Sequence, residues 1–401
     1  MEIAKKNFIK YCIQTTAYAV AAMFLNGVII QSFLLFVGLD EAQVYTYTSL
    51  SQLAQVGVMA LMIFISGRIK RGRQLSAFSN LLMLIPLALL IFGSVDPLLF
   101  TDTYVLIFFV VSFIVFGGIG LYSVLMYCLP FQVIDIADFG KFTGISGALA
   151  GVASFAVSSL YTAIISCFDY LGSMTCFFIL AVLCAALSSV MFFTMKNLPD
   201  TELGNNQVSR SDVLAVFKNR DTYLLIVPNF SRGLATGIFN VIAIMAVSSG
   251  VTDTTGASAF NIVLQVSSFA ASLIFVFLYR KLSIGRMIIF ATVGVCTLLP
   301  FSFTFGFVGF IILMLFALFF RCIIDSAIPT ALIKIIPENQ MGAYSSIRML
   351  TLTAAQAVAA ALVLPLVNTV GYVGVLIFAS VMQLICGLGH FWVIRSHNIK
   401  T

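Results

Sequence analysis

The sequence predicts an all-α integral membrane protein with twelve transmembrane helices in two six-helix pseudo-repeats. Three observations support this class: an apolar composition, twelve apolar segments of spanning length, and a one-sided distribution of basic residues. Of the 401 residues, 61% are hydrophobic and 9% are charged, whereas a soluble domain has about 25% charged residues. Strand-like alternation over about ten residues, which is typical of outer-membrane barrels, is absent from the sequence.

A spanning helix needs about 20 mostly apolar residues, and each of the twelve segments reaches that length. The predicted spans are residues 8–38, 42–66, 75–95, 103–130, 142–167, 171–195, 222–250, 255–280, 287–307, 308–334, 341–366 and 372–395. The first segment follows a basic N-terminus, as in a signal peptide, but it is too long for a cleavable core. We therefore expect it to be the first span.

Basic residues occur in alternate loops, and this sets the orientation. Lysines precede the first span, Arg68–Arg73 lie between the second and third, and others occupy the central loop and the C-terminus. The opposite loops contain acids and no Lys or Arg: Asp40, Glu41, Asp96, Asp102, Asp169 and Asp253. By the positive-inside rule both termini are cytoplasmic, and we expect a multi-pass protein of the cell (inner or plasma) membrane.

The longest polar stretch, residues 196–221, divides the chain into an N-terminal bundle of residues 1–195 and a C-terminal bundle of residues 222–401. The two bundles share spacings. Pro86 follows Arg73 by 13 residues, and Pro300 follows Arg286 by 14. Such repeats favour a duplicated six-helix unit with a ligand site near the middle of the membrane.

The loop after the second span reads Ile65-Ser66-Gly67-Arg68-Ile69-Lys70-Arg71-Gly72-Arg73-Gln74. It resembles the G-x-x-x-D-(R/K)-x-G-R-(R/K) loop of the major facilitator superfamily, with Ile69 in place of the acid, and Gly285-Arg286 repeats part of it. The resemblance covers the whole chain and implies secondary transport by alternating access. It also implies a cytoplasmic gate of Lys70, Gly72, Arg73, Gly285 and Arg286, with Asp135 or Asp138 as the partner of Arg73.

Four charges lie deep in the predicted spans of the second half: Arg232, Arg321, Asp325 and Arg348. Charge at such depth is costly unless it faces a partner or a wet cavity. Arg321 and Asp325 are four residues apart and share a helix face. We expect Asp325 to pair with Arg348, which leaves Arg232 and Arg321 without a protein counter-charge. A closed Arg–Asp pair that only fixes helix packing is the structural alternative.

Arginine binds carboxylates and phosphates through its planar fork, so the sequence favours a small organic anion as substrate, held by Arg232, Arg321 and Arg348. Polar side chains at helical spacing would give selectivity. These are Tyr18, Asn26, Gln52, Gln55, Tyr122, Thr236, Asn240 and Gln265. Asp325 is the one acid deep enough to take a coupling proton. The glycines Gly144, Gly147 and Gly151 predict close helix packing.

Other functions remain open. Thirty-nine phenylalanines suit proton-antiport efflux of amphiphilic compounds or drugs, and the first-half amides suit uptake of a neutral sugar or nucleoside. An enzyme would need a nucleophile with a base or a metal cluster, and we see neither. We expect no cofactor, no metal and no nucleic acid, and a monomer whose partners are the lipid bilayer and a small-molecule substrate.

Overall fold

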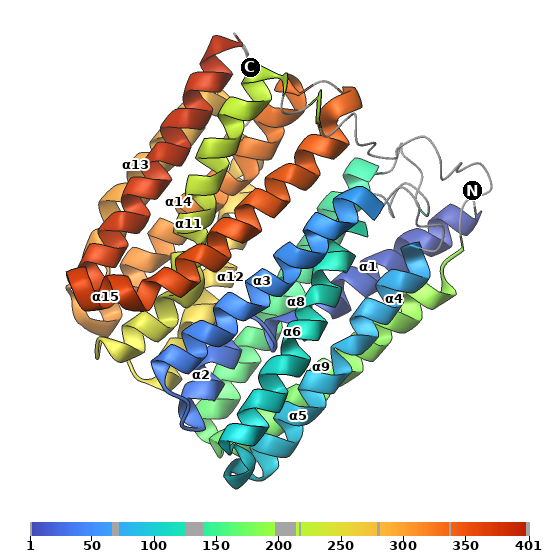
Figure 1. Cartoon of the computed structure of the whole chain (residues 1–401), viewed down its shortest axis with the longest axis vertical. Helices are drawn as coiled ribbons and strands as arrows, with labels where there is room; N and C mark the ends of the chain where they lie inside the picture. The colour runs from blue at the N-terminus through green and yellow to red at the C-terminus, as the bar shows by residue number, and fades with distance from the viewer. Residues whose placement is uncertain are drawn as a thin grey trace. The chain divides into compact units, whose positions relative to one another are not determined.

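In the computed structural model, the residues described are 2–65, 72–125, 133, 139–196, 214–215, 218–278, 281–336 and 338–397. They form helices and connecting turns (Figure 1). The chain divides into two compact units. Unit 1 is Met1–Gly38 with Ala54–Val208, and unit 2 is Leu39–Leu53 with Ser209–Thr401. The predicted boundary at residues 196–221 lies largely outside the described residues and stays a prediction.

In unit 1, α1 packs against α8 and α9, and α4 and α5 pack against α9 and α6. The bounds of these helices are α1 Glu2–Met23, α2 Val28–Phe36, α4 Gly72–Leu82, α5 Leu84–Val95, α6 Asp102–Leu125, α8 Phe139–Cys167 and α9 Tyr170–Thr194. Its core is rich in aromatic rings. Phe24 stacks on Phe177 with ring centroids 5.8 Å apart.

In unit 2, α11 packs along α15, and α13 and α14 pack against each other. The bounds are α11 Arg220–Ser248, α12 Thr254–Leu278, α13 Ile284–Leu298, α14 Gly306–Ile335 and α15 Glu338–Ser396. The helix α3, Glu41–Ile65, is divided, because Leu39–Leu53 groups with unit 2. There the Ser49 hydroxyl donates to the carbonyl of Ala357 at 3.2 Å.

Two glycines allow α11 and α15 to approach closely. A Cβ on Gly233 would lie 2.6 Å from the carbonyl O of Leu352, and one on Gly237 would lie 2.7 Å from that of Gln356. Any larger side chain would force the helices apart. The residues 231–246 are accordingly buried almost without interruption.

Two predicted spans are each broken into two helices. Residues 8–38 give α1 and α2, separated at Gly27, whose φ of 99° suits glycine. Residues 75–95 give α4 and α5, because Pro86 has no N–H to bond the carbonyl of Leu82, where α4 ends. The last two predicted spans both lie in α15, which consists of two helices that meet at Gly371, where the backbone is non-helical with φ 73°.

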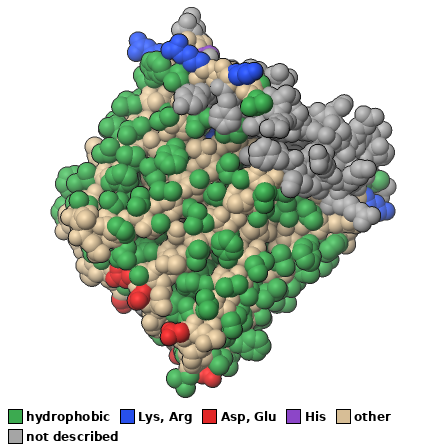
Figure 2. All heavy atoms as spheres, in the orientation of Figure 1, with side chains coloured by type: hydrophobic (Ala, Val, Ile, Leu, Met, Phe, Trp, Pro, Cys, Tyr) green, Lys and Arg blue, Asp and Glu red, His purple; other side chains and the backbone are tan. Residues whose placement is uncertain are grey.

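Among the described residues, nine helices are long and apolar enough to cross a membrane, and the nine include the combined stretch Ser346–Ser396. The helix α3 is not among these nine, and α12 has a shorter apolar stretch, Phe260–Phe275. Large apolar side chains such as Phe290 (65% exposed) and Leu183 (62% exposed) lie on the outside. Figure 2 shows a face on which hydrophobic side chains are widespread and basic and acidic side chains are few. The molecule is therefore a multi-pass membrane protein, whereas the count of twelve spans stays a prediction.

Candidate functional site

A cluster of charges lies inside unit 2, on α11, α14 and α15. Arg232 is 8% exposed, and the side chains of Arg321 and Asp325 are 15% and 33% exposed. All three lie in the interiors of apolar helices. In α14, Pro329 has no N–H, so the backbone carbonyl of Asp325 loses its usual intrahelical partner. This turn of α14 therefore carries both a charged side chain and a free main-chain acceptor.

Asp325 is the centre of the cluster. Its Oδ1 accepts from Arg232, at 2.6 Å from Nη2 and 3.0 Å from Nε. Its Oδ2 lies 3.8 Å from the Nε of Arg321, one helical turn away. The guanidinium of Arg321 also sits over the ring of Phe239, 4.6 Å from the centroid, in a cation–π contact. Two guanidinium groups thus share one carboxylate, and these three residues together carry one surplus positive charge.

These contacts correct one expectation. The sequence predicted that Asp325 would pair with Arg348 and leave Arg232 and Arg321 without a protein counter-charge, but both of these arginines meet Asp325. The expected common face of Arg321 and Asp325 is confirmed. Arg232 lies on α11 and Asp325 on α14, so this ion pair joins two helices. Residue spacing within one helix cannot predict a contact between two different helices.

Hydrogen-bonding capacity remains in the cluster. The Nη1 atom of Arg232 is buried and has no acceptor among the described residues. Asn229, one turn before Arg232, donates to the carbonyl of Arg348 at 2.8 Å, while its own Oδ1 has no described partner. Because buried polar atoms are nearly always paired in proteins, these two atoms are unmet hydrogen-bonding capacity in the cluster.

The other predicted residues of unit 2 lie on α3, α11 and α12. Thr236, 9% exposed, follows Arg232 by one turn, and Gln52, 4% exposed, is buried in α3. Asn240 follows Thr236 by one more turn on α11, and Gln265 is half-buried in α12. Thr236 and Asn240 therefore continue the face of α11 that carries Arg232.

Unit 1 contains a buried polar network, only part of which was predicted. The ring of Tyr18 lies 4.3 Å from that of Tyr122, and Gln14 donates to the Tyr122 hydroxyl at 3.0 Å. Gln14 and Asn80 both donate to the hydroxyl of Ser188, at 3.2 and 2.8 Å. Asn80 and Ser188 were not among the predicted site residues, and their positions as polar residues within the predicted spans 75–95 and 171–195 were the available signal.

The remaining two predicted residues of unit 1 differ in burial. Gln55 is buried, and its main chain lies so close to Gly120 of α6 that a Cβ there would come within 2.7 Å of the Gln55 carbonyl O. Asn26 is exposed within unit 1, beside the break between α1 and α2. The helix α6 thus holds α3 at Gln55 through a glycine contact.

The predicted gate is only partly described. Lys70, Asp135 and Asp138 lie outside the described residues, and so does the expected pair of Arg73 with Asp135 or Asp138. Arg73 donates through Nη1 to the carbonyl of Met195 at the end of α9. In unit 2, Gly285 is buried against Phe391, while Arg286 is exposed. Gly72 is buried at the start of α4.

No protein-family model matches the chain, and no curated protein matches it either. Solved structures do. A D-xylose–proton symporter matches with a TM-score of 0.72 at 15% identity over 97% of both chains. The nucleoside transporter NupG matches with a TM-score of 0.62 at 14% identity over 100% of both.

A bacterial homologue of the iron transporter ferroportin, in its outward-facing state, matches with a TM-score of 0.68 at 12% identity over 99% of this chain and 100% of that one. These low identities with nearly full coverage establish likeness of fold. The chain therefore has a fold like that of these transporters, in agreement with the fold that the sequence resemblance implied.

Proposed function

We propose that this protein is a secondary transporter that moves a small organic anion across the membrane by alternating access. The observation that carries the proposal is the sharing of Asp325 between Arg232 and Arg321, which leaves surplus positive charge inside apolar helices. Arginine keeps its proton at any physiological pH, so the surplus persists unless an anion offsets it. The unpartnered Nη1 of Arg232 would be a natural donor to a substrate carboxylate or phosphate.

The test is uptake by proteoliposomes of carboxylates, phosphate esters, sugars and nucleosides, with Arg232→Gln and Arg321→Gln variants. A hydrogen bond to a charged group contributes about 1.5–3 kcal/mol, so each variant should raise the half-saturation concentration for an anion about 10- to 100-fold. Lys281→Gln is the matched control, because Lys281 is exposed between α12 and α13. Uptake of every tested anion at the wild-type rate in both cluster variants would refute the proposal.

Proton coupling through Asp325 forms part of the proposal. In the described arrangement the carboxylate is held by two guanidinium groups, and an anionic substrate that competes for them would leave it less stabilised as a charge. The carboxylate would then take up a proton. An Asp325→Asn variant should still exchange substrate for substrate but lose accumulation driven by a proton gradient. Continued proton-driven accumulation would exclude Asp325 as the coupling site.

Uptake of a neutral sugar or nucleoside is the second candidate. The similar folds of a D-xylose–proton symporter and a nucleoside transporter, together with the buried amides Gln14, Asn80 and Gln52, favour it. In that case Arg232, Arg321 and Asp325 would act only in coupling and packing. The same uptake panel separates the candidates, since a neutral substrate would be transported and would compete with no anion.

The expected orientation is also a proposal. In unit 1 Asp102 lies at the start of α6, and in unit 2 Asp253 lies just before α12. Lys10 lies in the first half of α1 and Lys281 lies just after α12, and basic ends face the cytoplasm. Reporter enzymes fused at the two termini should both report a cytoplasmic location, and an exported terminus would refute this orientation.

A further inference from the structure

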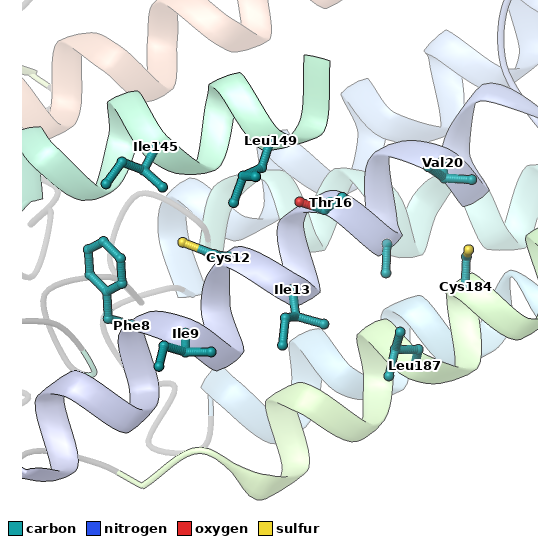
Figure 3. Close-up of a pocket in the computed structure, with 11 residues that line it drawn as sticks. Phe8, Ile9, Cys12, Ile13, Thr16, Val20, Ile145, Leu149, Cys184 and Leu187 are labelled. Carbon is teal, nitrogen blue, oxygen red and sulfur yellow. The ribbon is translucent and has the colours of Figure 1, made fainter. Parts of the chain in front are cut away.

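An apolar groove of about 510 Å³ lies in unit 1 between α1, α8 and α9 (Figure 3). It is lined by α1 from Phe8 to Val20, by Ile145 and Leu149 of α8, and by Cys184 and Leu187 of α9. Thr16 carries the one hydroxyl among the lining side chains, and that oxygen is buried. A groove of this composition offers its occupant only van der Waals contact and removal of apolar surface.

The shape of the groove suits a long apolar chain. The lining residues of α1 extend over twelve positions, which at 1.5 Å per residue amounts to about 18 Å. This length is close to half of the roughly 30 Å hydrocarbon core, that is, to one leaflet. Ile13 on α1 and Leu187 on α9, 40% and 42% exposed, lie along it.

Lysines gather at one end of the groove. Lys5 and Lys6 are exposed in the first turns of α1, just before Phe8. Two contacts bring the end of α9 to this turn. Asn7 bonds both the backbone N–H and the carbonyl of Lys196, at 3.1 and 2.6 Å, and Lys10 donates to the carbonyl of Thr194 at 2.6 Å. Lys196 is itself exposed, so several positive charges border one mouth of an apolar slot.

We propose that this groove binds an anionic phospholipid, with one acyl chain along α1 between α8 and α9 and the phosphate at the lysine end. The two parts of the site match the two parts of such a lipid. Lysines next to a membrane surface attract anionic headgroups, while a zwitterionic lipid of equal chain length would gain only the contacts in the groove. The site is separate from the charge cluster of unit 2 and does not depend on the transported substrate.

The test uses purified full-length protein and two lipid probes with the same photoreactive acyl chain, a phosphatidylglycerol and a phosphatidylcholine. After irradiation, peptide mapping locates the adduct. We expect the anionic probe to label residues 8–20 or 184–187 several-fold more than the zwitterionic probe. Each lysine contributes about 1 kcal/mol to the binding of an anionic lipid, so the double variant Lys5→Gln/Lys6→Gln should weaken binding of the anionic probe about 30-fold at low salt. The double variant Lys281→Gln/Arg286→Gln removes two exposed basic residues of unit 2 and should leave labelling of the groove by the anionic probe unchanged.

A second set of variants fills the groove. Ile13→Trp and Leu187→Trp should each abolish labelling, whereas Leu106→Trp, at a 63% exposed position on α6, should not. Gel filtration checks that each variant remains folded. The two filling variants lie on different helices, so that the test still stands if one of them does not fold. Equal labelling by both probes, or labelling that persists in both filling variants, would overturn the proposal.

The occupant is identified by a photoreactive amino acid placed at position 13 in cells. A phospholipid adduct in the mass spectrum of the protein supports the proposal. A cross-link to another part of this chain, or to a second protein, would show that a polypeptide fills the groove and would overturn it.

Discussion

The shared carboxylate of Asp325 predicts strong energetic coupling between α11 and α14. Replacement of Asp325 by Asn leaves the buried guanidinium of Arg232 without its counter-charge. Removal of one partner from a buried pair costs about 3–5 kcal/mol. Because the Asp325 side chain is 33% exposed, water offsets part of this cost, and we expect about 2 kcal/mol. Arg232→Gln should cost a similar amount, because it leaves the carboxylate with Arg321 alone at 3.8 Å.

The measurement is a double-mutant cycle on purified protein. For a unit of about 200 residues, 2 kcal/mol corresponds to a fall of about 4–8 °C in the thermal midpoint. The double variant Arg232→Gln/Asp325→Asn has neither charge, so it should be no less stable than either single variant. The interaction free energy should then be about 2 kcal/mol. Falls that simply add in the double variant would refute the ion pair as a source of stability.

Three further predictions follow from contacts within each unit. Gly237→Ala should lower the free energy of unfolding by about 1–3 kcal/mol, because it forces α11 away from α15. Gly147→Ala is the control, because its Cβ would meet nothing within 4 Å. A Gly237→Ala variant with the thermal midpoint of Gly147→Ala would refute the contact. Ser188→Ala leaves donors of Gln14 and Asn80 unpaired and should cost about 1–3 kcal/mol of unfolding free energy, and wild-type resistance to denaturant would contradict this. Phe239→Leu removes the cation–π contact of Arg321, worth about 0.5–2 kcal/mol, while the exposed Phe277→Leu should leave the thermal midpoint unchanged.

The apolar periodicity and length of the segments predicted where the helices lie, because lipid requires every backbone group to bond within its own helix. Breaks inside the apolar segments were missed. At Gly27 the backbone leaves the helical region, and before Pro86 the helical assignment is interrupted at Met83, although its φ and ψ stay helical. Hydropathy does not register either change. Gly371 agrees with the sequence, since its non-helical backbone falls between the last two predicted spans.

Within the candidate site, the sequence identified the charged residues but not their partners. Their depth in apolar segments was evident from position alone. Which arginine meets Asp325 depends on how α11 and α14 are rotated and registered, and one sequence does not contain that information. The glycines show the same limit. Gly147 was expected to pack closely and meets nothing within 4 Å, whereas Gly233 and Gly237, unnoticed in the sequence, make the tight contact.

The contact at Gly233 and Gly237 has a mechanical consequence. Because these backbones lie so close, α11 and α15 have no room to slide or rotate against each other. Arg232 on α11 and Arg348 on α15 therefore belong to one rigid helix pair. Asp325 stands on a different helix, beside the weakened turn at Pro329. If the ion pair between Arg232 and Asp325 opens during a transport cycle, we expect the Asp325 carboxylate to move and Arg232 to stay in place.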